Sequence, residues 1–313
     1  MKSKYIQNKL FSRLEEKKRL LDKQRPLSKE LILKLRDEFI VESTYNSNAI
    51  EGNTLTLKET RVVLEEGMTI AGKSLREHHE ATSHSEAIVF LESLVGKKKL
   101  DEEDILKIHA IIFKDIEKEF SGRYRQGAVR ILGASCIPPN YVKVPKLMKD
   151  LILWIKTNPE KLNPIELAAF AHYKFVEIHP FYDGNGRTAR LLMNLILMQN
   201  GFPRTVVPVS ERKKYFSALE KADKKNFAPF VNLMAQFVEN AMDLYLGALG
   251  KIEQGLLPLS EIAPKTSYSS EYLSLLARKG ELEATKRGKT WFSSLEAVKD
   301  YVKKRERKIR SHS

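Results

Sequence analysis

The chain has 313 residues, enough for one large domain or two to three small ones with a buried core. No apolar run reaches the roughly 20 residues that span a bilayer, and the charged N-terminus lacks an apolar signal core. The single Cys136 excludes an intrachain disulfide and a multi-cysteine zinc site. We therefore expect a cytoplasmic protein without membrane attachment. The net charge of +14 favours polyanionic partners such as nucleic acid or nucleotides.

Helical periodicity dominates the first 120 residues. Two charged helices are predicted on either side of Pro26. Thr56 and Glu59 form a capping box for a short helix that Gly67 can close. A long helix is predicted over 75–95, and Asp101 begins another that ends near residue 116.

The pattern changes over residues 121–143, which hold three glycines, paired prolines and the alternating run Val129–Ile131. Alternation between turn residues is typical of a β-hairpin. Helices resume at Pro145, and Asn163 with Pro164 is a strong N-terminal signal for the next one. Further helices are predicted at the positions 187–200, 210–222 and 227–249. A linker over 250–258 precedes a small basic module, 259–313.

The most informative stretch runs from His179 to Arg190 (HPFYDGNGRTAR). Two glycines at a helix start let backbone N–H groups approach an anion, and the helix dipole favours negative charge there. Two arginines three residues apart share a face and can hold phosphate oxygens. Asp183 is a hard oxygen ligand suited to Mg²⁺, and His179 is a side chain that can act as a base near neutral pH. Together these residues indicate phosphoryl or nucleotidyl transfer.

A Gly-rich turn with a capping aspartate and two surface arginines could also be purely structural. The full arrangement, however, resembles the signature of the Fic family, His-x-Phe-x-(Asp/Glu)-Gly-Asn-Gly-Arg-x-x-Arg, at every constrained position. The resemblance extends over roughly Leu100–Leu249. Most members of that family transfer AMP from ATP to a hydroxyl side chain of a target protein.

The resemblance implies a role for each residue of the motif. His179 would be the general base, and Asp183 would hold Mg²⁺ on the α- and β-phosphates. Gly184, Asn185 and Gly186 would form the anion hole, and Arg187 and Arg190 would hold the departing pyrophosphate. Thr188 and Ala189, between the two arginines, would also belong to the nucleotide site. Arg123 to Pro139 resembles the family's hairpin flap, which aligns a target by strand addition. Other residues implied near the nucleotide are Leu132, Gly133, Ala134, Ser135, Cys136, Tyr215 and Asp223, although Asn is more usual than Asp at the last position.

A second element lies upstream, in the run Ser47-Asn-Ala-Ile-Glu51-Gly52. It resembles the family's inhibitory motif, (Ser/Thr)-x-x-x-Glu-(Gly/Asn). Glu51 would then pair with Arg190 and occupy the place of the γ-phosphate. The protein would inhibit itself, either in cis or across a homodimer.

The C-terminal module resembles a winged helix-turn-helix of the excisionase type. Its recognition helix would span Ser270–Lys279, and Lys286, Arg287 and Lys289 would lie on the wing. From residue 251 onward, fourteen Lys and Arg stand against eight Asp and Glu. This balance of +6 is consistent with DNA binding through residues 259–313. A small packing module used for protein contacts is the alternative.

Two weaker candidates lie outside these motifs. His78, His79, Glu80 and His84 are close in sequence, but their spacing does not fit the two-histidine zinc helix, and we interpret them as surface or core histidines. Cys136 could be oxidised, but packing is the simpler role.

The sequence thus predicts a mainly α-helical, Fic-type bundle with a short β-hairpin flap and a small C-terminal winged-helix domain. The expected domains are 1–99 with the inhibitory helix, 100–250 with the catalytic core, and 251–313. The expected function is protein adenylylation with ATP and Mg²⁺ on Ser, Thr or Tyr, including self-modification. The alternatives are removal of AMP, transfer of another nucleotide, and a DNA-binding regulator with a nucleotide-sensing core.

Overall fold

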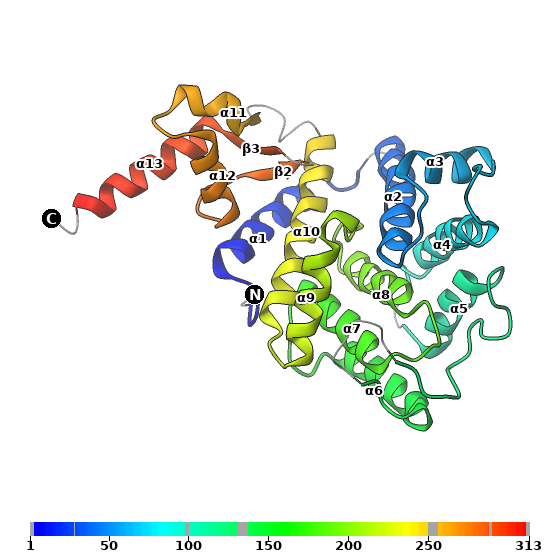
Figure 1. Ribbon diagram of the computed structural model, residues 1–313. Helices are drawn as coiled ribbons and strands as arrows, with labels where there is room; N and C mark the ends of the chain where they lie inside the picture. Colours follow the sequence, from blue (N-terminus) through cyan, green and yellow to red (C-terminus); the bar gives the residue numbers. More distant parts are fainter. Residues whose placement is uncertain are drawn as a thin grey trace. The chain divides into compact units, whose positions relative to one another are not determined.

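The computed structural model describes residues 3–27, 29–97, 100–130, 137–249, 256–287 and 290–310, with the backbone alone at 29, 30, 287 and 303–310. That part of the chain is mainly helical, as predicted (Figure 1). The chain divides into two compact units. Met1–Gln7 and Leu27–Val238 form the first unit, and Asn8–Pro26 and Glu239–Ser313 form the second. The three predicted domain boundaries remain predictions.

The first unit consists of helices joined by short loops. Its elements are α2 (Lys29–Ile50), α3 (Leu57–Glu66), α4 (Leu75–Ser93), α5 (Glu102–Phe113), the 3₁₀ turn Tyr141–Lys143, α6 (Val144–Thr157), α7 (Pro164–Ile178), α8 (Asn185–Gln199), the 3₁₀ turn Val209–Glu211, α9 (Arg212–Asp223) and the first half of α10 (Ala228–Ala248).

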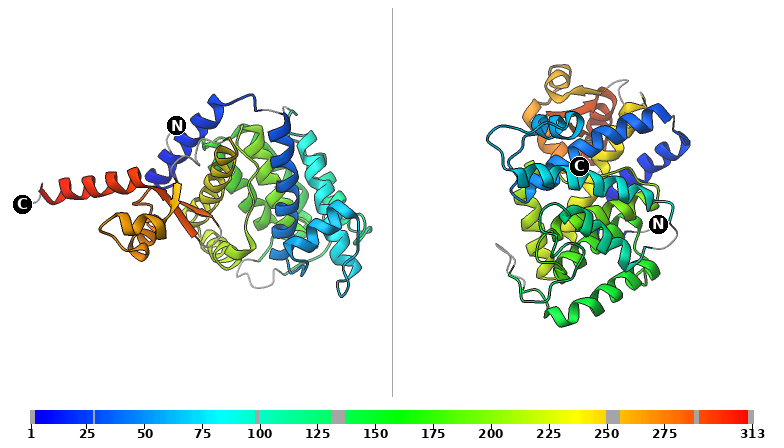
Figure 2. Two further views of the ribbon diagram at one scale, coloured as in Figure 1. Left: turned by 90° about the horizontal axis from the view of Figure 1, so that it is seen from above. Right: turned by 90° about the vertical axis from the view of Figure 1, so that its right-hand side faces the viewer.

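Helix α8 is the centre of this unit. It packs along α7 and also contacts α2, α4 and α5. Most of its residues, and most of those of α7, are buried. Figure 2 shows the surrounding helices from two further directions. Because α8 is covered by α2 and α4, residues far apart in the sequence meet at its N-terminus.

Local capping explains why these helices start where they do. The predicted capping box of Thr56 and Glu59 is present, and Gly67 closes α3 in the left-handed conformation. Asp101 caps α5, as predicted, through the backbone N–H of Asp104. Asn163 accepts two N–H groups at the start of α7. Each side chain satisfies donors that the first helical turn leaves free.

Two expectations about extended structure differ from the fold. Residues 121–130 and 137–143, the described parts of the predicted hairpin, contain no strand; the last three form a 3₁₀ turn. Leu132 to Cys136, predicted to lie near the nucleotide, are outside the described residues. The backbone N–H of Arg125 bonds the Pro180 carbonyl, so loop-to-loop contacts replace the expected ladder there. The end of the predicted linker, in contrast, is a strand, β1 (Leu256–Pro258).

The second unit combines an N-terminal helix with the C-terminal module. Its elements are α1 (Asn8–Lys23), the second half of α10, β1, α11 (Leu259–Ile262), the 3₁₀ turn Ala263–Lys265, α12 (Ser270–Arg278), β2 (Thr285–Arg287), β3 (Thr290–Ser294) and α13 (Leu295–Arg310). The strands form an antiparallel sheet in the order β1-β3-β2. A small apolar core that includes Ile262, Leu273 and Val298 holds the module together.

Ion pairs join α1 to α10 within this unit. Arg13 donates two hydrogen bonds, of 2.7 and 2.9 Å, to the buried carboxylate of Glu239. Lys17 lies 2.7 Å from Asp243, whose other oxygen accepts a hydrogen bond from Thr285 on β2. The module is thus tied to α10 by buried polar contacts. No helix in the described ranges is long and apolar enough to cross a membrane.

Candidate active site

The loop between α7 and α8 carries most of the predicted site residues. Its core is Phe181, which is fully buried and stacked on His109 of α5 with 3.6 Å between ring centroids. Asn185 bridges the loop, since its side chain accepts from the Phe181 N–H and donates to the Phe181 carbonyl. The Asn185 side chain therefore fixes the loop, and only its backbone is available to an anion.

His179 ends α7 in the left-handed conformation, with φ of 51°. Its Nδ1 lies 3.3 Å from the Val176 carbonyl. A carbonyl can only accept, so this contact places the ring hydrogen on Nδ1 and leaves the lone pair on Nε2. Burial lowers the pKa of His179, the Val176 carbonyl and Glu51 raise it, and the nearby charge of Arg125 lowers it, with a net decrease. The imidazole is therefore neutral at pH 7 and can accept a proton.

The start of α8 has the form of an anion site. Gly184 has φ of 75°, and a Cβ there would run into the Phe113 ring, so only glycine fits. A Cβ on Gly186 would meet the Glu51 carboxylate and come within 3.1 Å of Arg190 Nη1. The first helical amides have no partner within the helix. The N–H of Gly184, just before them, donates to the Asp183 carboxylate. The carboxylate of Glu51 thus lies where an anion would bind.

Arg190 is held by the end of α2. Its Nη2 lies 2.7 Å from Glu51 Oε1 and 2.9 Å from the Ser47 carbonyl, and its Nε donates to Ser47 Oγ at 2.9 Å. The Arg190 side chain is 5% exposed and that of Glu51 is 35% exposed. Gly52 follows with φ of 108°, which turns the chain away from the helix. The predicted contact between Glu51 and Arg190 is present, and it forms within a single chain.

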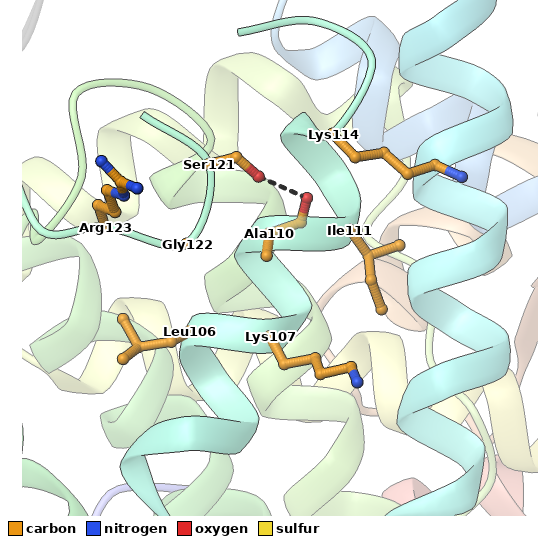
Figure 3. Close-up of a pocket in the computed structure, with 8 residues that line it drawn as sticks. All are labelled: Leu106, Lys107, Ala110, Ile111, Lys114, Ser121, Gly122 and Arg123. Carbon is orange, nitrogen blue, oxygen red and sulfur yellow. Dashed lines mark hydrogen bonds between the residues drawn. The ribbon is translucent and has the colours of Figure 1, made fainter. Parts of the chain in front are cut away.

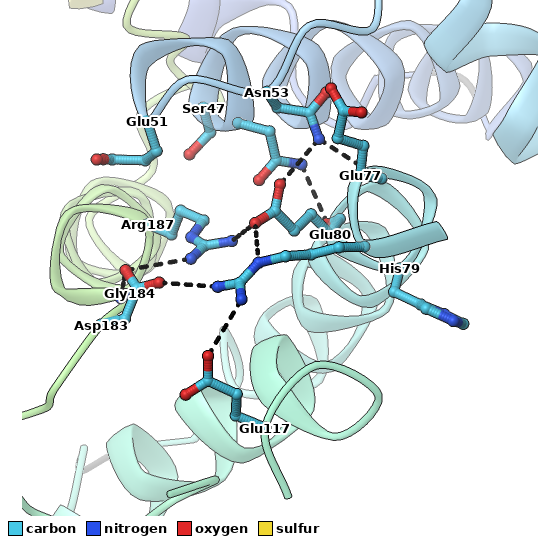
Figure 4. Close-up of polar contacts among 12 residues, drawn as sticks. Ser47, Glu51, Asn53, Glu77, His79, Glu80, Glu117, Asp183, Gly184 and Arg187 are labelled. Atoms are coloured by element: carbon cyan, nitrogen blue, oxygen red, sulfur yellow. Dashed lines mark hydrogen bonds and ion pairs between the residues drawn. The ribbon is translucent and has the colours of Figure 1, made fainter. Parts of the chain in front are cut away.

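Arg187 is buried among carboxylates. Figure 4 shows it between Glu80 on α4 and Asp183, at 3.5 and 3.4 Å respectively. Arg76 contacts Asp183 at 3.4 Å from the solvent side and also Glu117 at 3.1 Å. Arg187 Nε and Arg190 Nη1 are buried without a hydrogen-bond partner in the described structure. These unpaired donors give the site spare capacity for phosphate oxygens.

Asp183 meets the requirements for holding Mg²⁺ on a polyphosphate. Its side chain is half exposed at the mouth of the anion site, and a carboxylate is a ligand that Mg²⁺ prefers. No group of three metal-ligating side chains occurs in the described residues, so the other ligands would be phosphate oxygens and water.

The remaining predicted residues are buried or partly buried, and Tyr215 interacts with Arg190 of the site. Thr188 and Ala189 are fully buried in α8. Tyr215 is 1% exposed, and its hydroxyl lies 2.9 Å from His172 Nε2, so its ring packs inside the fold. Burial raises the pKa of Tyr215 to about 12. The ring beside it that reaches solvent is Phe216, which is 40% exposed. Asp223 ends α9 and is partly buried.

The histidines of α4 have structural roles, as interpreted from the sequence. His78 accepts from the Ile70 N–H and donates to the Ser74 carbonyl. His84 is fully buried beside Thr44, and burial lowers its pKa to about 3. Figure 4 shows His79 pointing away from the carboxylates.

Two residues at the site were missed in the sequence. His109 donates from Nε2 to the Asp183 carbonyl at 3.1 Å and accepts from the Gly122 N–H at 3.0 Å. Arg125 donates to the His179 carbonyl at 2.8 Å. His109 could have been recognised in the sequence, because it is a polar residue on the apolar face of α5. Arg125 has no such signal, because its partners are backbone carbonyls.

The comparisons with known proteins agree with this geometry. A family model described as the Fic/DOC family matches residues 99–197. The solved structure of Fic-1 from C. elegans is 37% identical, with a TM-score of 0.70, and the match covers 78% of this chain and 74% of that one. A structure of a Fic domain containing signaling protein from Bacteroides thetaiotaomicron is 28% identical, with a TM-score of 0.68 and coverage of 77% and 96%.

The chain therefore belongs to the Fic family. Among curated proteins, the protein adenylyltransferase fic-1 of Caenorhabditis elegans is 39% identical over 242 residues, which is 75% of this chain and 47% of that protein. Relatives named protein adenylyltransferase Fic from Drosophila persimilis and Nematostella vectensis are 37% and 39% identical. The chain spans about half the length of the curated relatives it matches.

Proposed function

We propose that the protein transfers AMP from ATP to a Ser, Thr or Tyr hydroxyl of a target protein, and that Glu51 restrains this activity. The observation that carries the proposal is the imidazole of His179 beside a glycine-bounded helix start with two buried arginines. The names of the relatives support the same reaction.

The nucleotide would bind at the start of α8. The backbone N–H groups of Gly184 to Gly186 would donate hydrogen bonds to phosphate oxygens, and Arg187 and Arg190 would hold the departing pyrophosphate. Asp183 would hold Mg²⁺, exchanging its contact with Arg76 for the metal. When bound, Mg²⁺ would neutralise charge on the phosphates.

The chemistry is a single displacement at the α-phosphorus. The acceptor oxygen forms a bond to that phosphorus as its proton passes to His179 Nε2. The bond between the α-phosphorus and the bridging oxygen breaks, and pyrophosphate leaves with both electrons of that bond. The hydrogen bond from Nδ1 to the Val176 carbonyl keeps the ring in the tautomer this step requires.

Glu51 would act by competing for Arg190. Its carboxylate lies 2.7 Å from that guanidinium and against Gly186, so a γ-phosphate and Glu51 would contend for the same cation. ATP bound beside Glu51 would have its α-phosphate out of line with His179. Since the contact forms within one chain, the geometry supports inhibition in cis.

ATP labelled at different phosphates tests the reaction type. Label from the α-phosphate should appear on protein in a Glu51→Gly sample mixed with host lysate, and label from the γ-phosphate should not. Label from both positions would indicate another transfer reaction. Loss of label from pre-modified protein, catalysed by the wild type, would favour the removal of AMP.

The pH profile should report the environment of His179. A base works when unprotonated, so a lowered pKa keeps it active to lower pH. The acid limb of kcat/KM should therefore lie below the ordinary value of 6.5. Because the charge of Glu51 raises the pKa of His179, Glu51→Gly should move the limb lower still. A limb above 6.5 in either protein would contradict the assignment.

We propose secondly that the C-terminal module binds DNA. The favouring observation is the order of α11, α12 and the β2–β3 hairpin around one apolar core, with Lys286 on the hairpin beside Trp291. Lys289 lies outside the described residues. This order fits a helix-turn-helix followed by a wing.

Charge reversal on the hairpin tests this second proposal without cutting the module from α10. The full chain should shift a duplex probe, with affinity that falls steeply with salt. Lys286→Glu with Arg287→Glu should weaken binding by about tenfold or more, because two phosphate contacts become repulsive. Lys149→Glu with Lys156→Glu on α6 is the matched control and should bind as the wild type does. If the full chain does not bind duplex DNA at low salt, a protein-contact role is favoured.

A further inference from the structure

Arg125 is a buried cation whose hydrogen-bond partners are all carbonyls. It is 2% exposed. Its guanidinium donates to the carbonyls of His179 at 2.8 Å, Gly127 at 3.0 Å and Pro139 at 2.5 Å. Its own backbone N–H donates to the Pro180 carbonyl at 3.0 Å. One residue thus joins the catalytic loop to two points of the chain that are twelve residues apart.

Burying the Arg125 guanidinium without a counter-ion costs free energy, which suggests a functional reason for keeping it. No carboxylate lies within ion-pair distance of Arg125 in the described structure, and burial lowers the pKa of Arg125. A buried charge without a counter-ion is costly unless it is fully hydrogen bonded. The flat fork of arginine can reach three separate carbonyls, whereas the single ammonium of lysine is a point charge on a flexible stem.

The carbonyl that Arg125 holds belongs to a residue in a strained conformation. His179 has φ of 51°, which is uncommon for a residue with a side chain and is stable only where neighbours fix it. Holding this carbonyl fixes the backbone from which the His179 side chain projects. Arg125 is therefore placed to fix the direction from which Nε2 approaches a substrate.

The segment 121–127, which contains Arg125, makes further contacts with the catalytic loop. His109 bridges the Gly122 N–H to the Asp183 carbonyl, and the Gln126 N–H donates to the Tyr182 hydroxyl at 3.1 Å. At its start the segment packs on α5, where Ser121 donates to the Ala110 carbonyl beside a hollow of about 490 Å³ (Figure 3). The position of the segment and that of the loop are thus coupled.

We propose that Arg125 is a positioning residue that holds His179 in a fixed position relative to Gly127 and Pro139, two points of the predicted target-binding segment Arg123–Pro139. The inference rests on the proposed AMP transfer. The Arg125 guanidinium would fix the position of the base, His179, and also the positions of Gly127 and Pro139, beside which a target would bind. Nucleotide binding, which relies on α8, should not depend on Arg125.

Kinetics in the Glu51→Gly background test this role. Arg125→Lys and Arg125→Met should each lower kcat by about tenfold or more, because misplacement of about 1 Å can cost a hundredfold. The affinity for a non-hydrolysable ATP analogue should stay close to that of the parent, and KM for the target should rise. Arg61→Met, the same change at an exposed arginine of α3, is the control and should not alter these values. Unchanged kcat in both Arg125 variants would overturn the proposal.

The pH profile separates positioning from charge. Arg125→Lys keeps the positive charge, so its acid limb should stay near that of the parent while kcat falls. Arg125→Met removes a charge that lowers the pKa of His179, so its limb should move to higher pH. Glu51 is already absent from this background, and Asp183, which raises the same pKa, is common to all variants. A limb that moves equally in both variants would contradict a role through the hydrogen bonds.

Amide hydrogen exchange provides a readout that needs no activity. Arg125→Lys should increase exchange by about tenfold in peptides covering both 126–130 and 176–184, because local opening of the two segments is coupled through one side chain. An increase in neither peptide, or in only one of them, would overturn the proposal. If Arg125→Met fails to fold, Arg125→Lys decides. If Glu51→Gly transfers no AMP, the proposed function fails and the exchange result still tests the coupling.

Discussion

Replacing His179 with alanine in the Glu51→Gly protein should lower AMP transfer by about 10²–10⁴-fold, the usual contribution of a general base. Binding of an ATP analogue should be unchanged, because the anion site is formed by α8 and its arginines. The measurement is the initial rate of label incorporation at saturating ATP, with analogue affinity determined by calorimetry.

His79→Ala is the matched control, since His79 points away from the site (Figure 4). It should transfer AMP at the parent rate. If His179→Ala also did so, another group would have to accept the proton, and the assignment of the base would be wrong. A loss of analogue binding by His179→Ala would instead show a role in holding the nucleotide.

Replacing Glu51 with glycine should increase AMP transfer by about 10- to 100-fold. A hydrogen bond to a charged partner contributes about 1.5–3 kcal/mol, and each 1.4 kcal/mol is a factor of ten. Removing Glu51 makes Arg190 available to the γ-phosphate. Glu51→Gln, which keeps the size but not the charge, should give a smaller increase. The readout is self-modification in the presence of Mg²⁺.

Glu66→Gly, the same change at the exposed end of α3, should have no effect on AMP transfer. Ser47→Ala should give a small increase, because it removes one of the two contacts that Ser47 makes with Arg190. Equal labelling of wild type and Glu51→Gly would remove the inhibitory role. A loss of labelling in Glu51→Gly would make Glu51 a participant in the reaction.

The order of the helices could be predicted from the sequence because their caps are local. Asp101 and Asn163 bond amides two or three residues ahead, so the signal and its structural effect are close in the chain. The loop of His179 to Gly186 was recognisable for the same reason. Glu51 and Arg190 are 139 residues apart in the sequence. Their contact could be predicted only because each lies in a run that resembles a motif of the Fic family.

What the sequence did not reveal depends on distant packing. Arg125 binds backbone carbonyls, which every residue has, so no pattern of side chains marks its partners. Tyr215, predicted to lie near the nucleotide, interacts with both His172 and Arg190, and neither partner could be read from the sequence. A helical period identifies the residues that share a face of α9, but not the helix that covers that face. The short alternation at Val129–Ile131 indicated a strand; Val129 and Arg130 lie in no strand, and Ile131 is outside the described residues. Nearby, the backbone N–H of Arg125 bonds the Pro180 carbonyl of the catalytic loop.

Intact-mass spectrometry of the purified protein after incubation with ATP and Mg²⁺ tests the central claim most directly. Glu51→Gly should gain the mass of one or more AMP groups, the wild type should gain little, and Glu51→Gly with His179→Ala should gain none. This pattern would assign transfer to the site at the start of α8 and restraint to the end of α2. No mass gain by Glu51→Gly, or equal gain with and without His179, would contradict the proposed function.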